Sequence, residues 1–193
     1  MAGRGSRLRP QTFITPKPLV KIAGKSILEQ LLDDVVGLND QPVQEIVFII
    51  GSPIIFDNNI VFKLKKLAKK YKSKATMCRQ LKPLGTGDAV LCAKDHLKGK
   101  AFVIYPDNLV RFNKKFDESL DVVIWTKKVK NPREYGVVKL DTRDHVVDLI
   151  EHPEKFISDL AVIGVYYFKE IEILKDQLEK ALELKNENEG EFY

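Results

Sequence analysis

Hydrophobic and polar residues alternate along this chain of 193 residues with two different periods. Through the first half, amphipathic stretches with apolar residues at helical spacing alternate with short and nearly continuous apolar runs. The run 45–50, for example, stops at a Gly-Ser-Pro turn. This alternation predicts an α/β fold in which a mostly parallel sheet carries helices on both faces. The predicted helices are 24–38, 63–74 and 87–97, and the predicted strands are 45–50, 75–79 and 101–105.

The second half of the chain has a different pattern, in which strand-like runs are separated by turn residues. The polar residues 141–144 predict a hairpin turn between two of these runs. No internal repeat is visible, and the length suits one globular domain over residues 1–193. The predicted strands are 121–129, 136–140, 146–151 and 161–168, and a terminal helix is predicted over 170–184.

Composition places the chain among soluble proteins, because hydrophobic residues make up 44% and charged residues 31% of it. No apolar run approaches the ~20 residues that cross a membrane, and Met1 is not followed by a secretory signal. Cys78 and Cys92 have no spacing typical of a disulfide framework. We therefore expect a cytoplasmic protein with no membrane partner, and the sequence leaves open whether it forms a homo-oligomer.

The formal charge of +5 comes largely from lysines in the stretch 63–74. Ile60, Leu64 and Leu67 fall at helical spacing there, so the lysines occupy the solvent side of an amphipathic helix. Aromatic residues do not interleave with the basic ones in the way that a nucleic-acid surface requires. We expect no nucleic-acid partner.

The first segment with candidate chemistry is Gly3-Arg4-Gly5-Ser6-Arg7-Leu8-Arg9-Pro10. Its two glycines let backbone N–H groups approach an anion closely, and its arginines add positive charge. The segment is not a P-loop, because no Gly-Lys-Ser/Thr ending follows, and it lacks the third glycine of a dinucleotide fingerprint. By itself it is equally compatible with a basic N-terminal tail.

Lys17 stands between two prolines in Thr15-Pro16-Lys17-Pro18-Leu19. Each proline fixes its own backbone, so the lysine is presented rigidly; a stiff loop with a solvated lysine is the alternative interpretation. With Gly24-Lys25-Ser26-Ile27, these segments resemble the signature of nucleotidylyltransferases that use sugar 1-phosphates: G-x-G-S/T-R-L-x-P, then P-K-P-L, then G-K/R-x-I. The resemblance implies a Rossmann-like α/β fold of the nucleotide-diphospho-sugar transferase type.

Two further segments extend the resemblance. Gln80-Leu81-Lys82-Pro83-Leu84-Gly85-Thr86 is similar to the family's base-recognition segment, and a side-chain amide suits a uracil or thymine edge. Tyr105-Pro106-Asp107-Asn108 places a carboxylate after a predicted strand, where ligands of open α/β sheets collect. By resemblance to the family's G-D-N or A-D-T motif, Asp107 is a magnesium ligand. Taken alone, Gln80 is more typical of a strand-end surface residue, and a turn residue is the alternative for Asp107.

Three segments on the sugar side match the family less closely. Glu134-Tyr135-Gly136-Val137-Val138 is similar to the Y-G-V strand, whose glycine admits the sugar ring, and Ser158-Asp159-Leu160-Ala161-Val162 corresponds to S-N-x-A-V. Glu151-His152-Pro153 corresponds to E-K-P, with the glutamate accepting sugar hydroxyls. His152 replaces the lysine that meets the sugar phosphate. Because a histidine is mostly neutral near pH 7, we expect weaker phosphate binding.

The resemblance implies a full set of site residues. Residues 1–110 would bind the nucleotide and residues 111–193 the sugar phosphate. Catalysis is assigned to Arg7, Lys17 and Asp107, with Mg²⁺ on Asp107. The nucleotide-binding residues are Ala2, Gly3, Gly5, Ser6, Arg7, Gln80, Pro83, Gly85 and Thr86, and the sugar-phosphate-binding residues are Tyr135, Gly136, Glu151, His152, Asp159 and Val162.

The implied reaction transfers a nucleotidyl group from UTP or dTTP to a sugar 1-phosphate and releases pyrophosphate. The sequence shows neither the family's opening strand before the first loop nor its G-E-x-x-x-T-D segment with a second metal-binding aspartate. We therefore expect the first strand to be missing, the chain to be truncated at both ends and its turnover to be impaired. The alternatives are a non-catalytic nucleotide- or sugar-phosphate-binding domain and a cytidylyl- or guanylyltransferase that acts on another phosphorylated alcohol.

Overall fold

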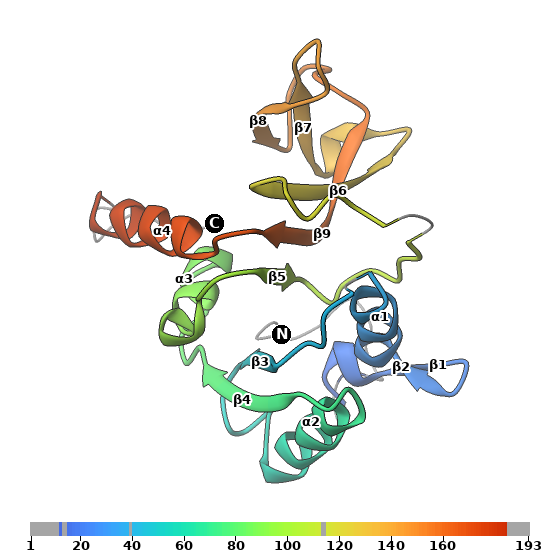
Figure 1. The fold of residues 1–193 in the computed structure, drawn as a ribbon, viewed down its shortest axis with the longest axis vertical. Helices are drawn as coiled ribbons and strands as arrows, with labels where there is room; N and C mark the ends of the chain where they lie inside the picture. Colours follow the sequence, from blue (N-terminus) through green and yellow to red (C-terminus); the bar gives the residue numbers. More distant parts are fainter. Residues whose placement is uncertain (1–11, 13–14, 39, 113–114, 185–193) are drawn as a thin grey trace.

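The computed structural model describes residues 12, 15–38, 40–112 and 115–184 (Figure 1). Helices and strands alternate through the first half, as the hydrophobic pattern predicts. The elements there are η3 (Lys17–Leu19), β1 (Lys21–Ile22), β2 (Lys25–Ser26), α1 (Ile27–Val36), β3 (Glu45–Ile50), α2 (Asn58–Lys70), β4 (Lys74–Arg79), α3 (Thr86–Leu91), η4 (Lys94–His96) and β5 (Ala101–Ile104).

The second half is built mainly from strands, and the four predicted strands and the terminal helix are all present. The elements are β6 (Val122–Lys128), η5 (Pro132–Glu134), β7 (Gly136–Leu140), β8 (Val146–Glu151), β9 (Leu160–Phe168) and α4 (Glu172–Leu184).

Capping residues move the helix starts away from the predicted positions. The Ser26 Oγ accepts a hydrogen bond from the Glu29 N–H at 3.1 Å, so α1 begins at Ile27, and residues 21–26 form the β1–β2 hairpin instead. The Asp57 Oδ1 accepts from the Ile60 N–H at 2.8 Å, so α2 begins one turn earlier than predicted. A side-chain oxygen that accepts a hydrogen bond from an otherwise unpaired backbone N–H determines the residue at which the helix begins. The spacing of the apolar residues determines this position less closely. The predicted helix 87–97 was wrong as one element, because it divides into α3 and η4.

The described strands pair in separate groups. β3 and β4 are parallel over six residues, from Glu45↔Lys74 to Ile50↔Arg79. The five-stranded sheet has the order β5-β9-β7-β8, with β6 also paired to β9, and its pairs are antiparallel. The α/β class is confirmed. Antiparallel pairing is more frequent among the described strands than the alternation suggested, because β9 runs antiparallel to β5, β6 and β7.

Helix α1 joins the two halves of the molecule, because it packs on both sides. One face lies against β3 and α2, and the other lies against β9 (Figure 1). The buried members are Leu28, Leu32, Phe48, Ile50, Phe56, Ile60, Leu64 and Ala68 in the first cluster and Leu31, Val35 and Val165 in the second.

Helix α2 is amphipathic in the predicted way. Its buried residues are Ile60, Leu64 and Ala68, while Lys65 and Lys66 are exposed. In the part of the chain that the structure describes, no helix combines the length and apolar character that crossing a membrane would need.

Candidate active site

Lys17 and Asp107 meet in the structure. The Lys17 Nζ lies 2.9 Å from the Asp107 Oδ1, although the two residues are 90 positions apart in the sequence. The Lys17 side chain is 27% exposed and that of Asp107 is 65% exposed, so the pair lies at a surface that a charged ligand can reach. The ion pair brings together two of the three residues to which the sequence assigns catalysis.

The segment around Lys17 is held by its prolines and by short backbone hydrogen bonds. Pro16 caps the 3₁₀-helix η3, and the Leu19 N–H donates to its carbonyl at 2.8 Å. Pro18 is buried, and the Val20 N–H donates to the Lys17 carbonyl at 3.1 Å. Because the proline rings fix φ on both sides of the lysine, few backbone states remain in which the ammonium could leave this surface.

The carboxylate of Asp107 is placed by the end of β5. Beyond Ile104, the Tyr105 N–H donates to the Gly164 carbonyl at 2.8 Å, and the Asp107 N–H donates to the Tyr105 carbonyl at 2.8 Å. The neighbouring Asn108 amide donates to the Ile163 carbonyl at 3.4 Å. The loop that carries Asp107 is therefore tied to β9.

An irregularity in β9 makes room for this loop. The register between β6 and β9 shifts at Ile124/Thr126, opposite Gly164, which has φ +77°. A Cβ at Gly164 would lie 3.1 Å from the Tyr105 Cβ, so the close approach and the positive φ both favour glycine. Bulges of this kind redirect a strand beside a functional site.

Gln80 is almost fully buried, with 7% of its surface exposed. Its Nε2 donates to the Gly85 carbonyl at 2.9 Å and to the Asp88 Oδ2 at 2.7 Å. Because both partners are acceptors, the amide orientation is determined: the nitrogen faces the loop and Oε1 points to the other side. Gln80 thus braces the turn at Gly85, which has φ +107° and precedes α3. Pro83 lies exposed on the loop between them.

On the sugar side, the strand pairing brings Gly136 of β7 opposite Glu151 of β8. A Cβ on residue 136 would lie 2.6 Å from the Glu151 Oε1, so the carboxylate occupies the space that the glycine leaves open. Val162 lies in β9, which pairs with β7 at Ala161. Tyr135 precedes β7 and is 44% exposed.

His152 is held by backbone groups of the loop before β7. Its N–H donates to the Tyr135 carbonyl at 3.2 Å, and its Nδ1 lies 3.2 Å from the Arg133 carbonyl. A carbonyl only accepts, so the proton of a neutral ring is on Nδ1, and Nε2 is left as an acceptor. A neutral acceptor is unsuited to a phosphate. Asp159 uses its backbone carbonyl to accept from the Val129 N–H at 2.9 Å.

Two tyrosines to which the sequence assigns no role connect the two halves. The rings of Tyr105 and Tyr166 lie edge to face, with centroids 6.1 Å apart. Burial raises the pKa of Tyr166 to about 12, and the nearby Tyr105 and the charge of Glu151 add to the effect. The apolar pattern of 161–168 was the available signal for a half-buried Tyr166, but the pattern does not indicate that its ring packs against Tyr105.

Part of the predicted site lies outside the described residues. This part consists of Ala2, Gly3, Gly5, Ser6 and Arg7. Among residues that the structure does describe, no group of three or more His, Cys, Asp or Glu side chains could hold a metal ion.

Known proteins resemble this chain along its whole length. The family model described as "Nucleotidyl transferase" matches residues 1–192. The bifunctional protein GlmU of Methanocaldococcus jannaschii is 35% identical over 171 residues, which cover 86% of this chain and 38% of that protein. The low-salt glycan biosynthesis nucleotidyltransferase Agl11 of Haloferax volcanii is 33% identical over 173 residues, which cover 86% of this chain and 47% of that protein.

A eukaryotic relative is more distant. The catalytic subunit beta of mannose-1-phosphate guanylyltransferase of Drosophila melanogaster is 29% identical over 209 residues, which cover 100% of this chain and 54% of that protein. This chain therefore spans between 38% and 54% of the length of the three relatives.

Solved structures share the fold. A UDP-glucose pyrophosphorylase complexed with UDP-glucose has a TM-score of 0.74 at 19% identity, covering 93% of this chain and 76% of that one. A putative glucose-1-phosphate thymidylyltransferase from Bacillus anthracis has a TM-score of 0.74 at 21% identity, covering 100% of this chain and 76% of that one.

Proposed function

Because this chain belongs to the nucleotidyl transferase family, we propose that it transfers a nucleotidyl group from a nucleoside triphosphate to a sugar 1-phosphate and releases pyrophosphate. The contact between Lys17 and Asp107 at 2.9 Å is the observation that carries this proposal. It joins a cation suited to a phosphate with a carboxylate suited to a metal ion at one accessible surface.

The proposed reaction is a displacement at the α-phosphorus. A phosphate oxygen of the sugar 1-phosphate attacks this atom, and pyrophosphate leaves. A phosphate monoester is largely dianionic at neutral pH, so the reaction needs no general base. The obstacle is repulsion between two polyanions, and positioning and charge neutralisation therefore account for catalysis. In this proposal Lys17 neutralises the α-phosphate, and Arg7 with the backbone of residues 3–6 neutralises the rest of the triphosphate.

Asp107 is the residue that would hold Mg²⁺. Its side chain is 65% exposed, and among the described residues Lys17 is the ion-pair partner of its carboxylate. Magnesium ions in such enzymes are often bound by one or two carboxylates together with substrate phosphates, so a single accessible carboxylate fits an ion that arrives with the nucleotide. The bound ion would supply charge neutralisation at the phosphates. An exposed ion pair contributes only ~0–1 kcal/mol, so Lys17 can exchange Asp107 for the α-phosphate at little cost.

For the base, we propose uracil or thymine. The orientation of the Gln80 amide leaves Oε1 as the atom available to a ligand, since Nε2 is bound to Gly85 and Asp88. A carbonyl oxygen accepts from the N3–H of uracil or thymine, whereas N3 of cytosine is itself an acceptor. The same oxygen would also accept from guanine N1–H, so the amide argues against CTP more strongly than against GTP.

For the sugar, we propose that the Glu151 carboxylate, which lies over Gly136, accepts hydrogen bonds from sugar hydroxyls. Tyr135 and Val162 would contact the sugar. His152 and Asp159 lie on the loops that flank these strands and would face the sugar phosphate and the sugar ring. Unlike a lysine, His152 supplies no permanent positive charge there, so binding of the sugar phosphate would be weak on this side.

The proposal is tested by measuring pyrophosphate release from UTP, dTTP, GTP, CTP and ATP, each combined with a panel of sugar 1-phosphates and Mg²⁺. We expect release with UTP or dTTP, and a rate about 10- to 150-fold lower for Lys17→Ala, because one charge-assisted contact at the reacting phosphate contributes about 1.5–3 kcal/mol. Lys100→Ala is the matched control, since it removes the ion pair to Glu118 at 2.8 Å outside this site.

Three outcomes distinguish the alternatives. Release with CTP alone contradicts the role given to Gln80. Nucleotide binding that depends on Lys17 but gives no pyrophosphate with any pair of substrates indicates a binding domain without catalysis. Equal rates for Lys17→Ala and Lys100→Ala would remove the candidate site altogether.

A further inference from the structure

Helix α1 supports both of the segments that meet in the candidate active site. At its beginning, the Ile27 N–H donates to the Val20 carbonyl at 3.0 Å, which attaches the segment that carries Lys17. The segment that follows Asp107 also reaches this helix, because Val110 packs against the cluster that α1 shares with β9. The contact between Lys17 and Asp107 therefore depends on how firmly each of the two segments is attached to α1.

Arg111 makes a polar attachment between the second segment and α1. Its Nη1 lies 3.1 Å from the Asp34 Oδ1 and 3.0 Å from the Asp34 Oδ2. The Asp34 side chain is only 15% exposed, whereas that of Arg111 is 72% exposed. Because water reaches the Asp34 carboxylate poorly, losing the guanidinium would leave a mostly covered charge without its partner. The ion pair therefore fixes the place at which the segment crosses the helix.

The position of Asp34 is unfavourable for the helix by itself. It lies in the last turn of α1, which ends at Val36, and the negative end of the helix dipole disfavours a carboxylate there. Residues 33–36 include no lysine, arginine or histidine that could compensate. Arg111 supplies the positive charge from a segment 77 positions away in the sequence. The ion pair, and not the stability of the helix alone, accounts for an aspartate at this position.

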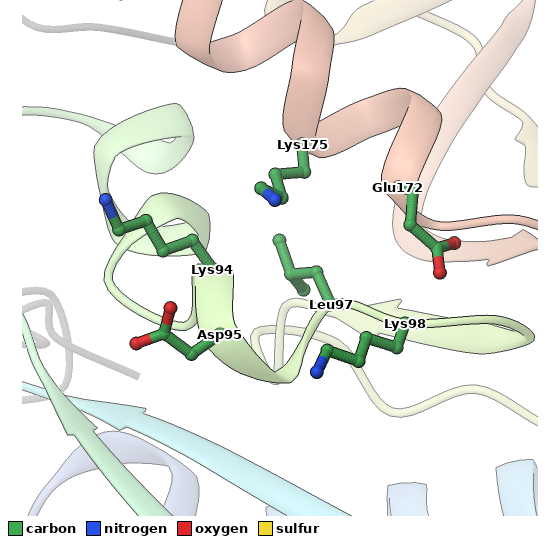
Figure 2. Close-up of a pocket in the computed structure, with 6 residues that line it drawn as sticks. All are labelled: Lys94, Asp95, Leu97, Lys98, Glu172 and Lys175. Atoms are coloured by element: carbon green, nitrogen blue, oxygen red, sulfur yellow. The ribbon is translucent and has the colours of Figure 1, made fainter.

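The other end of β5 is attached to a different helix. The Gly99 N–H, just before this strand, donates to the Glu172 Oε1 at 2.8 Å. Figure 2 shows the start of α4, with Glu172, on one side of a cavity of about 420 Å³ and residues 94–98 on the other side. The start of β5 is thus held by α4, whereas Arg111, four residues after Asp107, holds the segment beyond its carboxyl end to α1.

We propose that Arg111 is a positioning residue, which keeps the carboxylate of Asp107 at the ammonium of Lys17 through its ion pair with Asp34. The inference rests on the proposed function for what the Lys17–Asp107 pair does, and on the contacts alone for what holds the pair together. Without Arg111, the segment after Asp107 keeps its apolar packing but loses the polar contact that fixes its place along α1. The Asp107 carboxylate then spends more time away from Lys17.

The test is zero-length cross-linking of the whole chain with a carbodiimide. This reagent joins an amine to a carboxylate when the two are in contact, so the yield of the Lys17–Asp107 cross-link, measured by mass spectrometry, reports their contact without any substrate. We expect the yield to fall about 2- to 5-fold in Arg111→Ala and in Asp34→Asn, since a partly exposed ion pair has a small free energy. Arg111→Lys should retain most of it, because lysine keeps the positive charge.

Two controls separate this effect from a general loosening of the loop or the helix. Lys100→Ala removes the ion pair to Glu118 at 2.8 Å, near the far end of the same loop, and should leave the yield unchanged. The Lys70–Glu29 pair, at 3.0 Å, also involves α1. Its cross-link should form with the same yield in every variant, which confirms that the helix is folded.

Pyrophosphate release gives a second measurement. In Arg111→Ala the apparent KM for Mg²⁺ should rise about 2- to 5-fold, while kcat at saturating Mg²⁺ stays close to that of the parent protein, because a displaced carboxylate still binds the ion at high concentration. A partly unfolded variant would instead lose kcat with an unchanged KM.

The outcomes distinguish this inference from the proposed function. Equal yields of the Lys17–Asp107 cross-link in Arg111→Ala and in the parent protein overturn the inference, and so does an equal fall in Lys100→Ala. If the yields change as expected but the parent protein releases no pyrophosphate with any pair of substrates, the proposed function fails and the positioning role of Arg111 stands.

Discussion

The carboxylate of Glu151 lies directly over the α-carbon of Gly136, so that a Cβ added to the glycine would meet Oε1 at 2.6 Å. The two residues face each other in neighbouring strands, β7 and β8. A methyl group would displace the end of a flexible side chain on an exposed face and would not clash with backbone.

Gly136→Ala should therefore leave the fold intact and move the Glu151 carboxylate. We expect sugar 1-phosphate binding to weaken about 10-fold or more, because a hydroxyl hydrogen bond to a charged group contributes ~1.5–3 kcal/mol. Calorimetric titration measures the Kd, and Glu151→Gln provides the comparison. If Gly136→Ala binds the sugar 1-phosphate as tightly as the parent protein while Glu151→Gln binds it more weakly, the position of the Glu151 carboxylate does not depend on the glycine.

Gln80→Glu should destabilise the loop that precedes α3. The substitution replaces the Nε2 donor by an oxygen that faces the Gly85 carbonyl and the Asp88 carboxylate. Two half-buried acceptors lose their donor, which costs about 1–3 kcal/mol. Urea unfolding at pH 7.5 measures the free energy of unfolding.

Gln30→Glu is the matched control for this change. The Gln30 Nε2 donates to the Ile22 carbonyl at 2.8 Å in an exposed position, where water can replace the lost donor. If the free energy of unfolding falls no more in Gln80→Glu than in Gln30→Glu, Gln80 does not stabilise the loop.

Glu45 should make stability depend on pH in the acid range. The Thr76 hydroxyl, followed by Lys74 and His96, lowers the pKa of the Glu45 carboxyl from 4.5 to about 2 in the folded protein. As the pH falls, the Glu45 carboxylate is protonated at a higher pH in the unfolded chain than in the folded protein. The stabilisation is therefore complete above about pH 4.5 and is lost as the pH falls toward 2.

Urea unfolding of the parent protein and of Glu45→Gln between pH 6 and pH 2.5 tests this prediction. We expect the parent protein to be more stable at pH 6 and the difference to shrink at low pH. Glu154→Gln, at an exposed carboxylate, should show no such convergence. If the difference in free energy of unfolding between the parent protein and Glu45→Gln stays constant over the whole pH range, Thr76, Lys74 and His96 do not lower the pKa of Glu45 in the way described.

His152→Lys should tighten sugar 1-phosphate binding. The ring is held at the Arg133 carbonyl by Nδ1, 3.2 Å away. A lysine adds a full charge and a longer reach. We expect the Kd to fall several-fold, as measured by titration calorimetry, whereas His145→Lys, in the turn between β7 and β8, should have no effect. No tightening in His152→Lys would exclude position 152 from the phosphate site.

Local sequence patterns were sufficient for the type and order of the longer helices and strands, but not for the β1–β2 hairpin or for the division of 87–97 into α3 and η4. Apolar spacing identified the strands 45–50 and 136–140 with the bounds that the structure has. The period of the hydrophobic residues depends only on residues close in the sequence, so it can be recognised without knowledge of the fold. Helix starts were less well predicted, because one capping hydrogen bond, such as that of Ser26 or Asp57, outweighs the position of the apolar stripe.

The amino-acid sequence by itself determined that Lys17 is held between prolines, that Asp107 follows a strand and that Gly136 lacks a side chain. Only the tertiary structure decided that the ammonium of Lys17 meets a carboxylate 90 residues away, that Glu151 fills the space above Gly136, and that the Gly99 N–H meets the Glu172 carboxylate at the start of α4. Such contacts depend on sheet order, strand register and the packing of α4, which arise from many weak interactions over the whole chain and leave no signature in any one segment.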